Sequence, residues 1–163
     1  MNAKARFVLG KDGVIKVIEC PSGIRECEVI KRIGCHPVIV AYLLYVGKAE
    51  VVNEEGKSVN MEELIERVGN RNLWILFSTY LDLRKRGKIP EFGAEPNELV
   101  IDRERTCIYV YEENAMVTPS ELLSIVEKSI RKECRAIMAV VDMYGDVTYY
   151  EVSKMSFPKI ERR

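Results

Sequence analysis

The sequence predicts a protein of the α/β class (α+β) built as two small domains, and three observations support this prediction. The first is an alternation of helix-type and strand-type patterns in the second half of the chain, over residues 73–86, 106–111, 118–133, 136–141 and 147–152. The second is a hairpin-like pair of runs near the N-terminus, followed by helix-type segments. The third is a polar break at residues 69–72. We therefore predict a mixed α/β N-terminal domain over residues 1–70 and a C-terminal domain over residues 71–163, in which a small mixed sheet packs against helices.

The composition is typical of a soluble, intracellular protein. Of its 163 residues, 47% are hydrophobic and 31% are charged, and 25 basic residues balance 25 acidic ones. No apolar run approaches the ~18–20 residues of a membrane-spanning helix, and the N-terminus lacks the apolar core of a signal peptide. We expect a cytoplasmic location and no membrane contact. Because the net charge is zero, binding to a polyanion has to use local basic clusters or a surface shared with a partner.

The histidine and cysteine pattern does not predict a metal site. His36 is the only histidine, and the five cysteines contain no Cys-x-x-Cys pair; they are Cys20, Cys27, Cys35, Cys107 and Cys134. We therefore expect no metal and no cofactor. Buried thiols are the default interpretation. A structural disulfide is the alternative, and if one forms, we expect it to involve Cys20, Cys27 or Cys35.

The N-terminal half carries signals for three strands and three helices. The strands are predicted over residues 7–9, 14–18 and 48–52, and the helices over residues 24–33, 38–46 and 61–68. The helix at 38–46 is apolar nearly all round, so it should be buried. Asn60 is the predicted N-cap of the helix that follows it.

The next helix, residues 73–86, ends in a basic cluster. Trp74, Phe77 and Leu81, with their neighbours at 75 and 76, form its predicted apolar face. The basic cluster consists of Arg84, Lys85, Arg86 and Lys88. Two interpretations of it stay open: cations that the dipole favours at a helix C-terminus, or contacts with phosphate groups. Residues 88–101 contain two prolines and a glycine and are predicted to be mostly loop.

An apolar run followed by an acidic turn lies near the C-terminus. Residues 136–141 form an unbroken apolar run of strand length, and residues 147–152 return as a β-rich segment. Between them, Gly145 is free to take a positive φ, and Asp142 and Asp146 can bond nearby backbone N–H groups. Taken alone, this pattern predicts an ordinary hairpin with an acidic tip.

Several motifs resemble the archaeal tRNA-splicing (tRNA-intron) endonuclease family. Residues 80–87, Tyr-Leu-Asp-Leu-Arg-Lys-Arg-Gly, and Phe-Gly-Ala at 92–94 are similar to the family signature "Y-x-D-L-R-x-R-G … F-G-A-D". Residues 139–150 resemble its "A-I-V-D-x-x-G-D-I-V-Y-Y" strand, loop and strand, and residues 41–64 resemble its N-terminal motif. The motifs occur in the family's order over roughly residues 38–152, which is more specific than any one of them.

The resemblance implies RNA cleavage without a metal, in which the 2′-OH beside the scissile phosphate attacks it and leaves a cyclic phosphate. The family uses a tyrosine, a histidine and a lysine, and these positions fall on Leu99, Thr106 and Cys134. A threonine hydroxyl has no pKa near neutrality and cannot act as a general acid. The family's substrate-binding arginine is replaced by Glu127, which would repel phosphate. The sequence therefore predicts a structural subunit with no catalytic residues of its own.

The resemblance also implies how such a subunit assembles. In the family, the acidic loop docks into a basic cleft on a partner subunit, and the tyrosine strand after it pairs with its counterpart across a dimer. Asp142, Gly145 and Asp146 match the loop, and Tyr149 and Tyr150 match the strand. The implied protein is the structural subunit of a heterotetramer of two structural and two catalytic subunits. This complex would bind precursor tRNA at bulged intron-exon junctions, and the basic cluster supplies the candidate RNA contacts.

Two rival interpretations stay open. An enzyme with displaced catalytic groups would use Tyr109 or Tyr111 with Lys132 and Arg135, and it would have to cleave RNA by itself. A scaffold without an RNA role would only mediate protein association.

Overall fold

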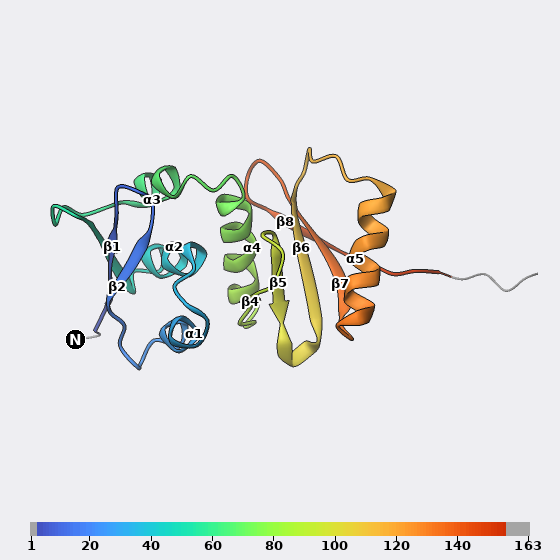
Figure 1. The fold of residues 1–163 in the computed structure, drawn as a ribbon, viewed down its shortest axis with the longest axis horizontal. Coiled ribbons are helices and arrows are strands. Elements are labelled where there is room, and N and C mark those ends of the chain that lie inside the picture. Colours follow the sequence, from blue (N-terminus) through green and yellow to red (C-terminus); the bar gives the residue numbers. More distant parts are fainter. Residues whose placement is uncertain (1–2, 156–163) are drawn as a thin grey trace, which may run out of the picture. The chain divides into compact units, whose positions relative to one another are not determined.

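The computed structural model of the protein describes residues 3–155, and contacts divide the chain into two compact units, Met1–Gly87 and Lys88–Arg163 (Figure 1). The structure contains helices and two mixed sheets, which confirms the predicted fold class. The helix expected to open the C-terminal domain groups with the first unit instead, because it packs against another helix there. The contacts thus divide the chain after Gly87, whereas the sequence predicted a boundary after residue 70. The predicted domain boundary stays a prediction.

The sheet of the first unit has three strands in the order β2-β1-β3. β1 (Ala5–Leu9) pairs antiparallel with β2 (Ile15–Glu19) and parallel with β3 (Ala49–Asn53). Phe7 and Leu9 are fully buried, because alternate side chains of a strand point to the same face. The predicted N-terminal hairpin is confirmed.

Four helices complete the first unit: α1 (Arg25–Ile33), α2 (Pro37–Tyr45), α3 (Met61–Val68) and α4 (Leu73–Lys85). α2 packs against α3, α4 and β3, and its residues 38–43 are buried, as its apolar sequence predicts. His36 caps α2: its Nδ1 accepts a hydrogen bond from the backbone N–H of Val38 at 3.2 Å. Burial lowers the pKa of His36 to about 4, so the ring stays neutral and Nδ1 keeps the lone pair that this bond needs.

The buried face of α4 differs from the predicted one. Leu76 and Tyr80 are almost completely buried, whereas Trp74, Phe77 and Leu81 are only partly buried. The helix is apolar over most of its circumference, so its periodicity does not single out one face. The prediction of that face was therefore wrong in part, and packing against α2 selects a different set of residues.

The second unit is a five-stranded sheet in the order β4-β5-β6-β7-β8. Its strands are β4 (Glu91–Phe92), β5 (Glu98–Ile101), β6 (Thr106–Glu112), β7 (Arg135–Val141) and β8 (Val147–Val152). β6 and β7 are parallel, and α5 (Pro119–Arg131) connects them; the other neighbours are antiparallel. A capping box is present at the start of α5, where Thr118 and Glu121 each accept a hydrogen bond from the backbone N–H of the other.

The stretch predicted as mostly loop, residues 88–101, lies mostly outside strands, but it contains β4 and β5, which the prediction missed. Residues 98–101 pair with β6, with Glu98 opposite Tyr109. The four residues of β5 are too few to show the alternation of a strand, so β5 is recognised only by its pairing with β6. Behind these strands, Cys107, Tyr109, Ile125 and Ala136 form a buried cluster between the sheet and α5.

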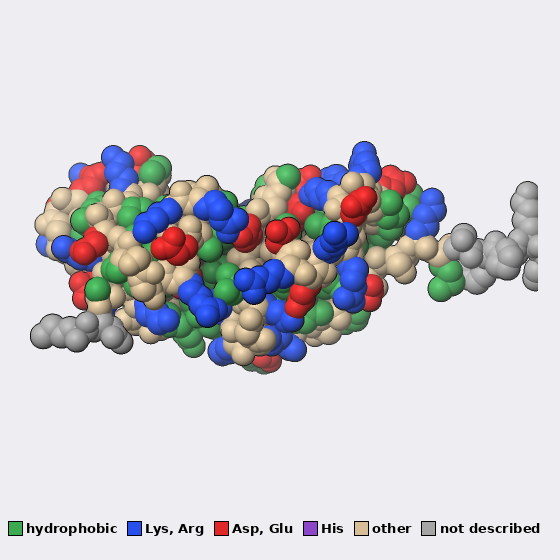
Figure 2. Space-filling model, turned by 90° about the horizontal axis from the view of Figure 1, so that it is seen from below, with side chains coloured by type: hydrophobic (Ala, Val, Ile, Leu, Met, Phe, Trp, Pro, Cys, Tyr) green, Lys and Arg blue, Asp and Glu red, His purple; other side chains and the backbone are tan. Residues whose placement is uncertain are grey.

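Two further features concern the surface. No helix in the described part of the chain is long and apolar enough to cross a membrane. Figure 2 shows Lys and Arg side chains beside Asp and Glu side chains over the visible face. This distribution agrees with the balanced charge of the sequence.

Candidate functional site

An open pocket of about 450 Å³ lies where the start of β6 meets the turn between α5 and β7. Thr106 and Cys134 line it together with Val100 of β5. Leu99 is fully buried and is not among the lining residues, because neighbouring side chains of a strand point to opposite faces. The structure thus brings together two of the three residues at the predicted catalytic positions.

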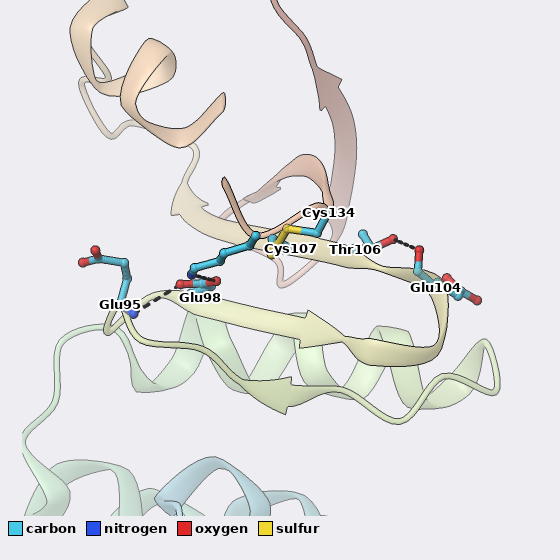
Figure 3. The surroundings of a disulfide bond; sticks show 7 residues. Glu95, Glu98, Glu104, Thr106, Cys107 and Cys134 are labelled. Carbon is cyan, nitrogen blue, oxygen red and sulfur yellow. Dashed lines mark hydrogen bonds and ion pairs between the residues drawn. A yellow bond between two sulfur atoms is a disulfide. The ribbon is translucent and has the colours of Figure 1, made fainter. Parts of the chain in front are cut away.

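Neither of these two residues can exchange a proton near neutral pH. The Thr106 hydroxyl donates a hydrogen bond to the Glu104 carbonyl at 3.1 Å, and Thr106 is 5% exposed. The Sγ of Cys134 is bonded to the Sγ of Cys107, so it is neither a thiol nor a thiolate (Figure 3). The pocket therefore holds no acid or base at the two positions where the family resemblance places them.

Two residues in left-handed backbone conformation flank this disulfide. Arg105 has φ 47° and Glu133 has φ 55°, which is unfavourable for residues other than glycine. The backbone N–H of Arg135 donates to the Arg105 carbonyl at 2.7 Å, where β6 and β7 begin to pair. The strand pairing and the covalent bond together hold both residues in this conformation.

The disulfides correct the expectation that the cysteines are buried thiols. Cys20 is bonded to Cys27, which agrees with the group of cysteines named for a disulfide, whereas the Cys107–Cys134 bond was not predicted. Cys35 is the free cysteine of the described chain, and burial raises its pKa to about 11. No group of three or more His, Cys, Asp or Glu side chains that could hold a metal occurs among the described residues.

Three of the four groups named for a displaced active site are ion-paired or buried. Lys132 Nζ donates to Glu98 Oε1 at 2.9 Å, and this hydrogen bond is the main reason why the Lys132 pKa is raised. Tyr109 is 2% exposed. Arg135 donates to both carboxylate oxygens of Glu151, at 3.1 and 3.0 Å. These contacts argue against the first rival interpretation, because a protonated, paired lysine and a buried tyrosine are poor bases.

The acidic loop is closed by its own backbone. Asp142 Oδ1 accepts hydrogen bonds from the N–H groups of Tyr144 and Asp146, both at 2.9 Å. The N–H of Gly145 donates to the Asp142 carbonyl at 3.1 Å, and Gly145 has φ 84°, which glycine adopts without strain. Asp146 is exposed, whereas Asp142 is partly buried.

The loop leads into β8, an edge strand of the sheet. Tyr150 is 51% exposed on this strand, and Tyr149 is partly buried. An edge strand presents unpaired backbone groups, which is the geometry that sheet extension requires.

Comparison with known proteins finds relatives over most of the chain. No family model matches the sequence. A tRNA-splicing endonuclease of Thermococcus onnurineus is 30% identical over 126 residues, covering 72% of this chain and 73% of the relative. One of Pyrococcus horikoshii is 31% identical over 127 residues, with 72% and 73% coverage. One of Methanothermobacter thermautotrophicus is 29% identical over 131 residues, with 74% and 76% coverage. This chain belongs to the tRNA-splicing endonuclease family.

The basic residues of the endonuclease signature make structural contacts here. Arg84 Nη2 lies 2.6 Å from Glu26 Oε1, with the two side chains 13% and 1% exposed, and its guanidinium stands over the Tyr42 ring. Arg86 pairs with Asp82 at 2.8 Å. Lys88 pairs with Glu104, and Lys85 is exposed at the end of α4. The ion pairs favour a structural role for Arg84, whereas the exposure of Lys85 leaves it available for phosphate contact.

The glycine of the Phe-Gly-Ala motif has a steric role in this chain. A Cβ at Gly93 would collide with the side chain of Glu98. The Glu98 side chain is fully buried and ion-paired with Lys132, so moving it away would break the ion pair that compensates this buried carboxylate. Gly93 therefore makes room for Glu98.

Proposed function

We propose that this chain is the structural, non-catalytic subunit of a heterotetrameric tRNA-splicing endonuclease. The observation that carries the proposal is the Cys107–Cys134 disulfide, which occupies the position where the family resemblance expects the catalytic lysine. Thr106, at the histidine position, donates its hydroxyl to a backbone carbonyl. At the family's catalytic positions, this pocket offers no base to deprotonate the attacking 2′-OH, no acid for the leaving 5′-oxygen, and no lysine to hold the phosphate charge.

The proposed role is to position a catalytic partner. Two copies of this chain would assemble with two catalytic subunits in the cytoplasm, without a metal or another cofactor. The rigid acidic loop would enter a basic cleft of the catalytic subunit, where complementary charge contributes specificity and association rate. The edge strand β8, with Tyr149 and Tyr150, would pair with the matching strand of another subunit and so extend the sheet.

The proposed substrate is precursor tRNA, bound by the assembled complex at bulged intron-exon junctions. Splayed bases and phosphates are recognised by shape and charge rather than by a sequence code. Since this chain has no net charge, most of the electrostatic attraction for RNA would come from the partner.

A cleavage assay tests the proposal. The purified chain should leave a bulge-containing precursor tRNA intact, and a mixture with the catalytic subunit from the same genome should cleave it and leave 2′,3′-cyclic phosphate ends. The catalytic subunit alone is the control and should cleave far more slowly. Specific cleavage by this chain alone, surviving repurification, would overturn the non-catalytic role. A complex that assembles without binding or cleaving RNA would instead support the scaffold interpretation.

A further inference from the structure

The tip of the acidic loop carries two large side chains whose apolar surface is mostly exposed to solvent. Met143 is 78% exposed and Tyr144 is 82% exposed. Leaving apolar area in water forgoes about 25 cal/mol for each Å² that could be buried. Single exposed apolar residues are common, but two in succession at a protruding turn form a contact surface rather than scatter.

The loop presents these side chains on a backbone that is ordered in advance. Asp142 Oδ1 accepts two backbone N–H groups at 2.9 Å, and the Asp142 N–H donates to the Asp146 carbonyl at 3.0 Å. One of the two N–H groups is that of Tyr144 itself, so the aspartate fixes the backbone from which the tyrosine projects. A loop that is already ordered loses less conformational entropy on binding. Asp142 therefore acts mainly on the loop's shape, and its carboxylate is turned to backbone donors.

Carboxylates surround the base of the loop. Glu112 ends β6 next to it and Glu113 follows, with the Glu113 N–H donating to the Val141 carbonyl at 2.9 Å. Both glutamates and Asp146 are exposed, and none of the three has an ion-pair partner within the described residues. A tyrosine at the loop tip, with unpaired carboxylates at the loop base, is complementary to an apolar floor with arginine or lysine at its rim, since a guanidinium can stack on the ring and pair with a carboxylate.

We propose that Tyr144, assisted by Met143, is the anchor by which this subunit docks into the catalytic subunit, in a recess with an apolar floor and a cationic rim. This inference rests on the proposed function and adds an aromatic anchor to its charge-based docking. Tyrosine is among the residues enriched at binding hot spots, where one buried ring contributes more than the charges around it.

The test measures the dissociation constant between the full chain and the catalytic subunit from the same genome. Tyr144→Ala should weaken the complex by about 30-fold or more, the size expected of a hot-spot residue, and Met143→Ala by about 5-fold. Tyr144→Phe keeps the ring and should stay within about 3-fold of the parent. Met116→Ala, at a residue that is 95% exposed in the segment before α5, is the matched control and should change nothing.

Each other outcome overturns a specific claim. If the parent chain does not bind the catalytic subunit, the proposed function fails, and the anchor fails with it. If the parent binds and Tyr144→Ala binds equally well, the proposed function survives and the anchor is wrong. If Tyr144→Ala leaves assembly intact and weakens only precursor tRNA binding, the ring stacks on RNA rather than on protein. Unfolding curves of each variant, expected to match the parent because both side chains are exposed, exclude a folding defect as the cause.

Discussion

His36 couples the N-terminal cap of α2 to pH. Its Nδ1 can accept the Val38 N–H only while that nitrogen is unprotonated. Burial lowers the pKa of His36 from 6.5 to about 4 in the folded chain. As pH falls, the unfolded state therefore takes up the proton first. The stability that the neutral ring contributes is fully present above pH 6.5 and is lost as the pH falls towards 4.

Replacing His36 by asparagine should remove this pH dependence, because the amide oxygen can still cap α2 but does not titrate in this range. Between pH 7 and pH 5 the parent should lose about 1 kcal/mol more free energy of unfolding than His36→Asn, a figure reduced for the partial exposure of the ring. Urea unfolding at pH 7, 6 and 5 measures this difference. Parallel pH profiles for the two proteins would show that the ring does not titrate as described.

Among the connections between elements, the Cys107–Cys134 disulfide ties β6 to the turn between α5 and β7. Its cysteines are separated by 27 residues, compared with 7 for Cys20–Cys27. In the chain-entropy model a longer closed loop removes more freedom from the unfolded state. The model assigns about 3–4 kcal/mol to the longer loop and about 2–3 kcal/mol to the shorter one.

Removing the longer cross-link, with Cys107→Ala and Cys134→Ser together, should lower the free energy of unfolding by about 3 kcal/mol. The pair Cys20→Ser and Cys27→Ala is the matched control and should cost less. Equilibrium unfolding measures both. A thiol titration in denaturant without reductant should find only Cys35, and a titre of three or more thiols per chain would contradict the two bonds.

For the molecule as a whole, the balanced charge means that the proposed RNA binding would depend on particular exposed cations. Lys85 lies at the exposed end of α4, whereas the Arg84 guanidinium is held by Glu26 inside the first unit. The two neighbours in the basic cluster therefore serve different purposes. The exposed lysine is a candidate for phosphate contact, and the arginine holds α4 against α1.

In the assembled complex, Lys85→Ala should weaken binding to all precursor tRNAs alike and reduce the salt slope by about 1, with stability unchanged within about 0.5 kcal/mol. Arg84→Met should instead lower the free energy of unfolding by about 3–5 kcal/mol, because it leaves the Glu26 carboxylate buried without its partner. Filter binding over a range of salt concentrations, beside urea unfolding, separates the two effects. Unchanged RNA affinity in Lys85→Ala would remove this residue from the RNA surface.

Elements whose signals lie within a few residues could be predicted before the fold was known. The Thr118–Glu121 capping box marks the start of α5, and Asn60 Oδ1 accepts the Glu63 N–H at 2.9 Å where α3 begins. The unbroken apolar run at 136–141, the β-rich segment at 147–152 and the glycine between them identified the hairpin of β7 and β8. The order of the motifs indicated the family, which the relatives confirmed. Each of these signals lies within a few residues or in their linear order, so no partner is needed to read it.

Contacts between residues far apart in the chain depend on how the elements pack. Cys107 and Cys134 lie 27 positions apart and come together because β6 and β7 pair in parallel with Cys107 opposite Ala136. Arg84 and Glu26 are 58 positions apart and meet where α4 packs in the first unit. These pairings, and the choice of the buried face of α4, result from packing between elements that are far apart in the sequence. No local pattern encodes such a pairing. The sequence around the two cysteines is equally compatible with buried thiols, and the sequence around Arg84 is equally compatible with an exposed basic helix end.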